Sequence, residues 1–144
     1  MNRPFFRFFV KQPEWWSDKK YFIADELPPI RVSYHTGGAE PDDECCNRVM
    51  SALSPGYALI LDAASQILHN YSYAHFKKLR VPASRLVKEE APEAIAKAIR
   101  LRQASFWHKE PTEFELSFQV SWDEYHSYDV EFKDGRAVYC GVNG

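Results

Sequence analysis

The sequence predicts an α+β domain in which an antiparallel sheet packs against three or four helices. Apolar and polar residues alternate near the end of the chain, which is the two-residue period of half-buried strands, and aromatic-rich runs near its start have strand composition. The middle of the chain, from Pro41 to Lys109, follows helical spacing instead. Strands and helices segregated in this way indicate an α+β fold rather than alternating βαβ units. The 144 residues form a single expected domain, 1–144.

Three short strands are expected at the start of the chain. The aromatic-rich runs 5–10, 21–24 and 30–34 have the composition of strands. Prolines stand between these runs, and proline cannot donate a hydrogen bond to a central ladder. We therefore expect an irregular β region here.

Helices are expected in the middle of the chain. The first begins after Asp42, a residue that can cap a helix, and ends at Ser54-Pro55-Gly56. A second is predicted over 57–78, where apolar residues form one stripe. Further helical turns are predicted at 84–90 and 93–106.

The last thirty residues predict a three-stranded antiparallel meander, which completes the sheet. Its last turn contains Asp134-Gly135. A two-residue loop there would place apolar residues of one strand beside polar residues of the next, and such a slip turns every side chain to the wrong face. A three-residue loop, 133–135, instead pairs Val130 with Val138 and leaves Gly135 left-handed in a bulge. We expect the three-residue loop.

Composition excludes several classes of function. A net charge of −2 and a pI near 6.2 lack the basic field of a nucleic-acid-binding protein. No apolar run approaches the roughly 18 residues of a membrane span, and Arg7 interrupts the apolar start that might suggest a signal peptide. Three cysteines without metal-ligand spacing predict reduced thiols in a cytoplasmic protein, with no metal and no cofactor.

Two groups of residues raise the possibility of catalysis. Asp123 and His126 could form an acid/base pair, although extended backbone sends Asp123 and Glu124 to opposite faces and no second histidine lies at a ligand spacing. Cys45 or Cys46 lies at a predicted helix start, where the helix dipole favours a thiolate. These residues define one alternative function, a small hydrolase or thiol enzyme using His126 and Asp123 or Cys45.

Other residues suggest contacts with a partner protein. Trp15 and Trp16 are adjacent, so in an extended segment their indoles face opposite ways and one tends to be exposed. An exposed indole is a frequent centre of protein binding energy. Asp42, Asp43 and Glu44 could form an acidic contact patch for a basic partner, which residues 110–115 could extend, or they could serve only as a helix start.

The end of the chain resembles a known family. A strand closing with Trp122, Asp123, Glu124 and His126, then a second strand, the Asp134-Gly135 turn and a short last strand is similar to the carboxyl-terminal signature of small bacterial immunity proteins of polymorphic toxin systems, of the type VI or contact-dependent kind. The resemblance implies a cytoplasmic protein that binds a cognate toxin and occludes its active site. A subunit of a larger complex is a further alternative. The expected partner-binding residues are Trp15, Trp16, Asp42, Asp43, Glu44, Asp123, Glu124 and His126.

Overall fold

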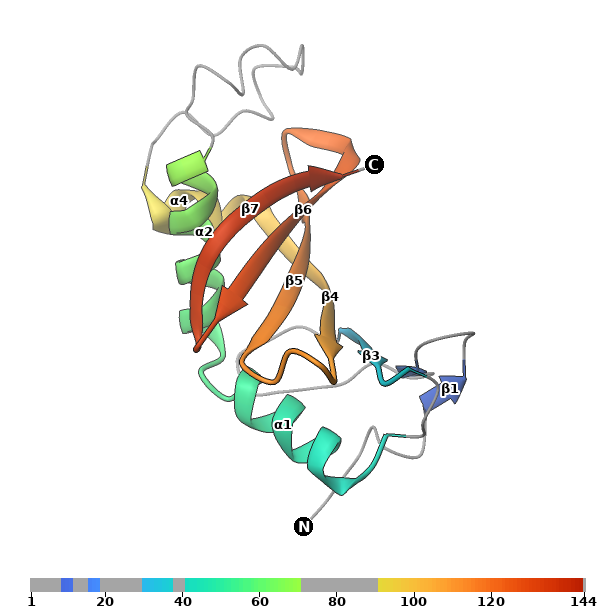
Figure 1. The fold of residues 1–144 in the computed structure, drawn as a ribbon. Helices are drawn as coiled ribbons and strands as arrows, with labels where there is room; N and C mark the ends of the chain where they lie inside the picture. Colours follow the sequence, from blue (N-terminus) through green and yellow to red (C-terminus); the bar gives the residue numbers. More distant parts are fainter. Residues whose placement is uncertain (1–8, 12–15, 19–29, 38–40, 71–90, 144) are drawn as a thin grey trace.

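The computed structural model describes residues 9–11, 16–18, 30–37, 41–70 and 91–143. They form one seven-stranded sheet with its strands in chain order, packed against helices, which confirms the α+β class (Figure 1). All neighbouring strands are antiparallel except β3 and β4, which are parallel. The elements are β1 (Phe9–Lys11), β2 (Trp16–Asp18), β3 (Arg31–His35), α1 (Asp43–Leu53), α2 (Tyr57–Asn70), α4 (Pro92–Ala98), β4 (Ile99–Trp107), β5 (Glu113–Val120), β6 (Asp123–Lys133) and β7 (Arg136–Asn143).

The start of the chain agrees with the sequence only in part. β1 falls at the end of the predicted strand 5–10, and β3 matches the strand predicted over 30–34. β2 was not predicted. The strand predicted over 21–24 lies outside the described residues.

The first predicted helix is confirmed. The side chain of Asp42 accepts a hydrogen bond of 3.0 Å from the backbone N–H of Cys45, as an N-cap does. Val49 and Leu53 are buried on one face of α1. α2 follows directly, and the rest of the helical region predicted up to residue 90 lies outside the described residues.

The helix predicted over 93–106 is wrong beyond Ala98. α4 ends there, and the chain continues as β4, which pairs with β3 on one side and β5 on the other. A shift of register between Leu101 and Gln103 inserts one extra residue into β4. Buried Leu101 and Ala104 are therefore three residues apart, which is the spacing of a helical face.

The three-residue loop predicted at 133–135 is also wrong. Lys133 pairs with Arg136, so Asp134-Gly135 is a two-residue loop, and both loop residues have positive φ, at 51° and 80°. Such angles are those of a type I′ turn, whose twist matches that of the flanking strands. A register shift at Glu131/Phe132 leaves Val138 as an extra residue, so apolar pairs are restored beyond it. Val138 is 51% exposed rather than core.

One face of the sheet forms the core with the helices. Rings from four adjacent strands stack across it, with centroid separations of 4.9 to 5.9 Å. α2 and α4 lie against this side of the sheet, and α1 lies near the end where β4 meets β5 (Figure 1). The four stacked rings are Tyr34, Phe106, Phe114 and Phe132.

Candidate binding surface

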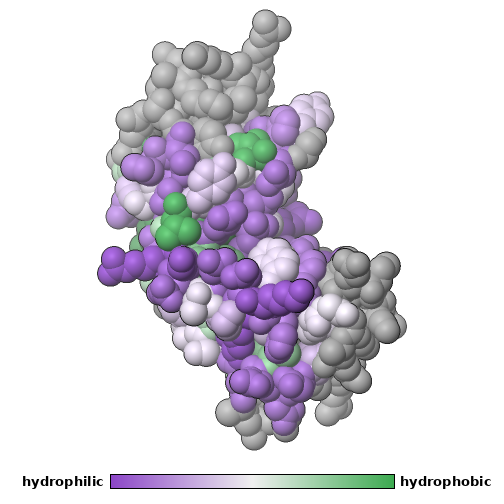
Figure 2. Space-filling view, in the orientation of Figure 1, coloured by the Kyte–Doolittle hydropathy of each residue, from purple (hydrophilic) through white to green (hydrophobic). Residues whose placement is uncertain are grey.

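The opposite face of the sheet is polar, and none of the described helices packs on it. The register aligns its side chains in rows that cross the strands at right angles. One row contains Ser33, Ser105, Glu115, Glu131 and Tyr139, taken from β3 to β7 in order. In the orientation of Figure 1, hydrophilic side chains dominate the surface over β6 and β7 (Figure 2).

Three carboxylates gather on this face, and we call their surroundings the acidic sheet face: Glu115 on β5 with Asp129 and Glu131 on β6. Glu115 is directly opposite Glu131, and Asp129 is opposite the next residue on that face of β5, Ser117. Asp129 accepts hydrogen bonds from the Ser127 hydroxyl and the Asn143 amide.

The carboxyl group of Glu115 is poorly solvated. Burial raises its pKa, and the negative charges of Asp129 and Glu131 raise it further, to about 7. A carboxyl with a raised pKa is one whose negative charge lacks compensation in the folded protein. The acidic sheet face therefore favours the approach of a positive charge.

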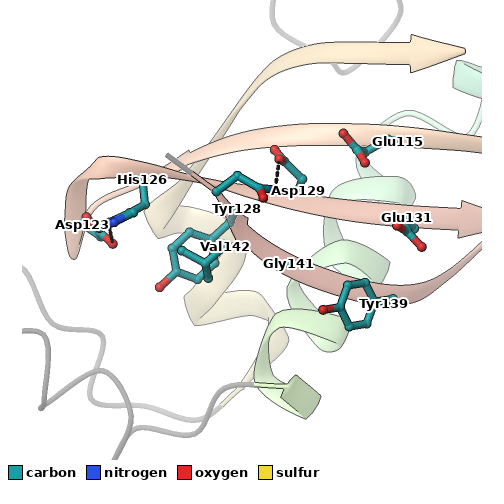
Figure 3. A pocket seen from close by; sticks show the side chains of 10 residues that line it. Glu115, Asp123, His126, Tyr128, Asp129, Glu131, Tyr139, Gly141 and Val142 are labelled. Carbon is teal, nitrogen blue, oxygen red and sulfur yellow. Dashed lines mark hydrogen bonds and ion pairs between the residues drawn. The ribbon is translucent and has the colours of Figure 1, made fainter.

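The acidic sheet face is hollowed. Two hollows of about 570 and 500 Å³ share Glu115, Asp129 and His126, so they adjoin each other. Figure 3 shows the first hollow, with Glu115 and Asp129 on neighbouring strands, and with Asp123 and His126 at the turn end. Tyr139 contributes a ring that is 50% exposed. The hollows offer space for side chains of a partner.

The turn between β5 and β6 closes one end of these hollows. Asp123 is buried, and its carboxylate contacts His126 Nδ1 at 2.7 Å and accepts a hydrogen bond of 3.1 Å from the backbone N–H of Tyr125. Glu124 and His126 are exposed, whereas Asp123 is buried. Asp123 positions His126, and the side chains in contact with solvent are those of Glu124 and His126.

The two groups of acidic residues predicted from the sequence to bind a partner, 42–44 and 123–124, lie at opposite ends of the sheet. Asp42, Asp43 and Glu44 are exposed at the start of α1, far from the β5–β6 turn (Figure 1). Trp15 lies outside the described residues. Trp16 belongs to β2, where its backbone pairs with Tyr34, and its side chain lies outside the described part of the chain.

The environment of Cys45 disfavours the thiolate on which the thiol-enzyme alternative depends. Cys45, Cys46 and Cys140 are all buried and unbridged. Burial raises the pKa of Cys45, and this cost of desolvation outweighs the backbone hydrogen bonding that lowers it. Across the described residues, no group of histidine, cysteine and acidic side chains could hold a metal ion.

The signature that carries the family resemblance is mostly structural in this chain. Trp122 is fully buried, and its indole N–H donates a hydrogen bond of 3.1 Å to the Tyr128 hydroxyl. Asp134 and Gly135 supply the positive φ angles of the turn. The signature thus marks how the last three strands are folded, while Glu124 and His126 remain at the surface.

The sequence did not identify the acidic sheet face. Glu115, Asp129, Glu131 and Tyr139 stand at alternate positions of three strands, and that alternation is the one local signal of a shared face.

Comparison with known proteins identified no relative of this chain. No protein-family model matches this sequence, and neither curated proteins nor solved structures gave a match. No helix in the described ranges is long and apolar enough to cross a membrane.

Proposed function

We propose that this chain is an immunity protein that acts in the cytoplasm, where it binds a cognate secreted toxin and occludes the toxin's active site. The observation that carries the proposal is the hollowed polar face of the sheet, on which none of the described helices packs. Inhibition by occlusion needs a complementary surface with a few anchoring side chains, and it needs no catalytic group. The resemblance of the last three strands supplies the toxin as the class of partner.

The support of this face suits a binding role. Its side chains project from strands that are hydrogen-bonded to neighbours, and stacked rings fill the core beneath them. A surface fixed in this way loses little conformational entropy when a partner docks.

The test is protection of bacteria from the product of the gene that neighbours the one encoding this chain. Cells expressing that gene should stop growing, and co-expression of this chain should restore growth. The two purified proteins should co-elute as a complex in size-exclusion chromatography. A toxic neighbour that this chain neither binds nor neutralises would exclude the proposal.

One observation favours a second candidate, a small hydrolase. His126 contacts Asp123 at 2.7 Å, and its side chain is 43% exposed beside the hollows, as a general base facing a substrate would be. Hydrolysis of p-nitrophenyl acetate by the purified chain, compared with His126→Ala, tests this candidate. Equal rates for the two proteins would exclude His126 as the base.

A further inference from the structure

We propose that the partner engages the acidic sheet face and presents to it a cationic segment rich in arginine or lysine. This inference rests on the proposed function, because it names the part of the toxin that would be bound. It also moves the expected contact surface away from the start of α1.

The charge balance of the two hollows favours a cation. Among the described residues that line them, five carry carboxylates and one, Arg102, carries a guanidinium group, while Lys133 lines a third hollow that shares Glu115 and Glu131. Arg102 donates a hydrogen bond of 3.0 Å to the Gln119 side chain at the margin of the sheet face. His126 is held by Asp123 at 2.7 Å. The five carboxylates belong to Glu115, Asp123, Glu124, Asp129 and Glu131.

The arrangement of the carboxylates favours insertion of a cation between strands. Side chains directly opposite each other in an antiparallel pair have Cβ atoms about 4.5–5.5 Å apart. Glu115 and Glu131 stand in this relation, so one guanidinium or ammonium group could contact both. Planar guanidinium groups also form paired hydrogen bonds with carboxylates, which gives the contact a direction.

Aromatic rings next to the carboxylates fit the same ligand chemistry. Tyr139 is directly opposite Glu131, and Tyr125, at the β5–β6 turn, is 81% exposed. A cation over an aromatic face is stabilised by about 0.5–1 kcal/mol at exposed sites. The other large apolar side chains lining the hollows, including Phe118 and Tyr128, are turned into the core. An apolar helix would therefore find little to bury here.

The acidic start of α1 is a weaker attractor for a cation. Its carboxylates lie at the positive end of a helix dipole, which already compensates part of their charge. Asp42 is also engaged as the N-cap, where the hydrogen bond from Cys45 lowers its pKa. This surface thus provides a matched comparison for the acidic sheet face.

The experiment uses fluorescein-labelled nona-arginine as a probe and the full chain. At pH 8, where Glu115 is mostly ionised, fluorescence anisotropy compares the wild type with two double variants that each replace two carboxyl groups, E115Q/E131Q on the sheet face and D43N/E44Q on α1. The first should weaken binding about tenfold, and the second less than about twofold. Amide shifts in NMR spectra of the wild type should change along β5, β6 and β7.

Several results would overturn the inference. Equal losses in both variants would mean general charge attraction, and amide shifts confined to α1 would place the site there. If Mg²⁺ alone shifts the same amide signals, the acidic sheet face is a metal site. If the wild type is a dimer and E115Q/E131Q is a monomer, the occupant of this face is a second copy of the chain. The NMR experiment uses the wild type, so it tests the location of the site even if a variant folds poorly.

The inference and the proposed function can fail separately. If E115Q/E131Q folds and protects cells from the toxin as well as the wild type does, the immunity function stands and the acidic sheet face is not the contact surface. If nona-arginine binds as expected but the chain protects against no neighbouring toxin, the cation-binding face stands and the immunity function fails.

Discussion

Glu115 on β5 lies directly opposite Glu131 on β6, so two carboxylates of like charge face each other across the sheet. Like charges in this position destabilise an antiparallel pair. Burial makes the larger contribution to the raised pKa of Glu115, and Asp129 and Glu131 add to it. The folded protein therefore tolerates an unfavourable charge on the face that we assign to binding, as surfaces reserved for a partner often do.

Glu115→Gln should stabilise the protein at pH 8. The pKa of Glu115 is about 7 in the folded state against an ordinary 4.5, so the folded state holds a proton that the unfolded chain has lost between these values. Wild-type stability consequently falls as pH rises through this window. Because Glu115 is only half-buried, we expect a gain of about 1–3 kcal/mol in the free energy of unfolding at pH 8. The gain should vanish near pH 4, as measured by urea denaturation.

The pH dependence separates this effect from a general change of charge. Among the described residues, the ionisable groups that share a hollow with Glu115 include Asp129, Glu131 and Lys133 on β6, Tyr139 on β7, Arg102 on β4 and His126 near the turn. Glu44→Gln removes an exposed carboxylate from α1 and serves as the control. An equal gain for Glu115→Gln at pH 4 and pH 8 would contradict the assignment.

Arg48 fastens α1 to the end of the sheet where β4 turns into β5. Its guanidinium donates hydrogen bonds to the backbone carbonyls of Trp107 at 2.8 Å and Glu113 at 2.6 Å, and it also donates to that of Glu110. It lies over the Phe106 ring at 5.5 Å from the centroid. One side chain thus satisfies three carbonyls at the connection between β4 and β5.

Arg48→Met should lower the free energy of unfolding by about 2–4 kcal/mol, because it leaves carbonyl groups without a charged donor. Arg48→Lys should recover only part of this loss, since an ammonium group cannot reproduce the planar fork of donors. Arg102→Met removes a guanidinium with one exposed side-chain partner and should cost less than about 0.5 kcal/mol. Urea denaturation of the three variants measures these differences. Equal losses for Arg48→Met and Arg102→Met would be inconsistent with this role.

Local periodicity in the sequence predicted well which face of a strand is buried, but it predicted poorly the register in which the strands pair. Leu116, Phe118 and Val120 are buried, as their alternation indicates. The turn after Lys133 was mispredicted because a two-residue loop conflicts with the apolar pattern unless an extra residue follows it. Val138 is that residue. Its apolar side chain suggests a core position, although it is exposed in the structure. Bulges compensate register without changing composition, so alternation alone does not reveal them.

β4 shows that periodicity can also predict the wrong type of element. Its bulge near Arg102 gives apolar residues a spacing that also fits a helix. The choice is decided by partners distant in sequence, since β3 and β5 pair with both edges of β4. Tertiary pairing of this kind overrides local pattern.

The candidate site depends on the same long-range pairing. The sequence identified Asp123, Glu124 and His126 because they are neighbours in the chain. Glu115 and Glu131 are separated by a strand, a turn and half of another strand, and only their register makes them face each other. Surfaces composed across strands are therefore the features that sequence reasoning is least able to find.

The three thiols should be unreactive in the folded protein. Cys45, Cys46 and Cys140 are buried, and burial raises the pKa of Cys140 to about 12. The thiolate is the form that attacks Ellman's reagent, so at pH 8 we expect negligible reaction of the native protein within minutes and three equivalents after denaturation in guanidinium chloride. Fast reaction of one native thiol would revive the thiol-enzyme alternative.

Two side chains of α2 cover the outer edge of β7. Asp62 Oδ2 accepts a hydrogen bond of 2.9 Å from the backbone N–H of Ala137, and Asn70 Oδ1 accepts one of 3.2 Å from that of Cys140. Backbone donors at the edge of a sheet can otherwise pair with another chain. The helix thus blocks addition of a strand along this part of β7.

The double variant D62A/N70A should open this edge. We expect hydrogen exchange at the amides of Ala137 and Cys140 to become faster, and the free energy of unfolding to fall by about 1–3 kcal/mol because two side-chain acceptors are lost. Ser65→Ala, an exposed position on the same helix, should change neither quantity. Hydrogen exchange followed by NMR measures both amides in one experiment. If their exchange stays at the wild-type rate in D62A/N70A, the two side chains do not protect the edge of β7.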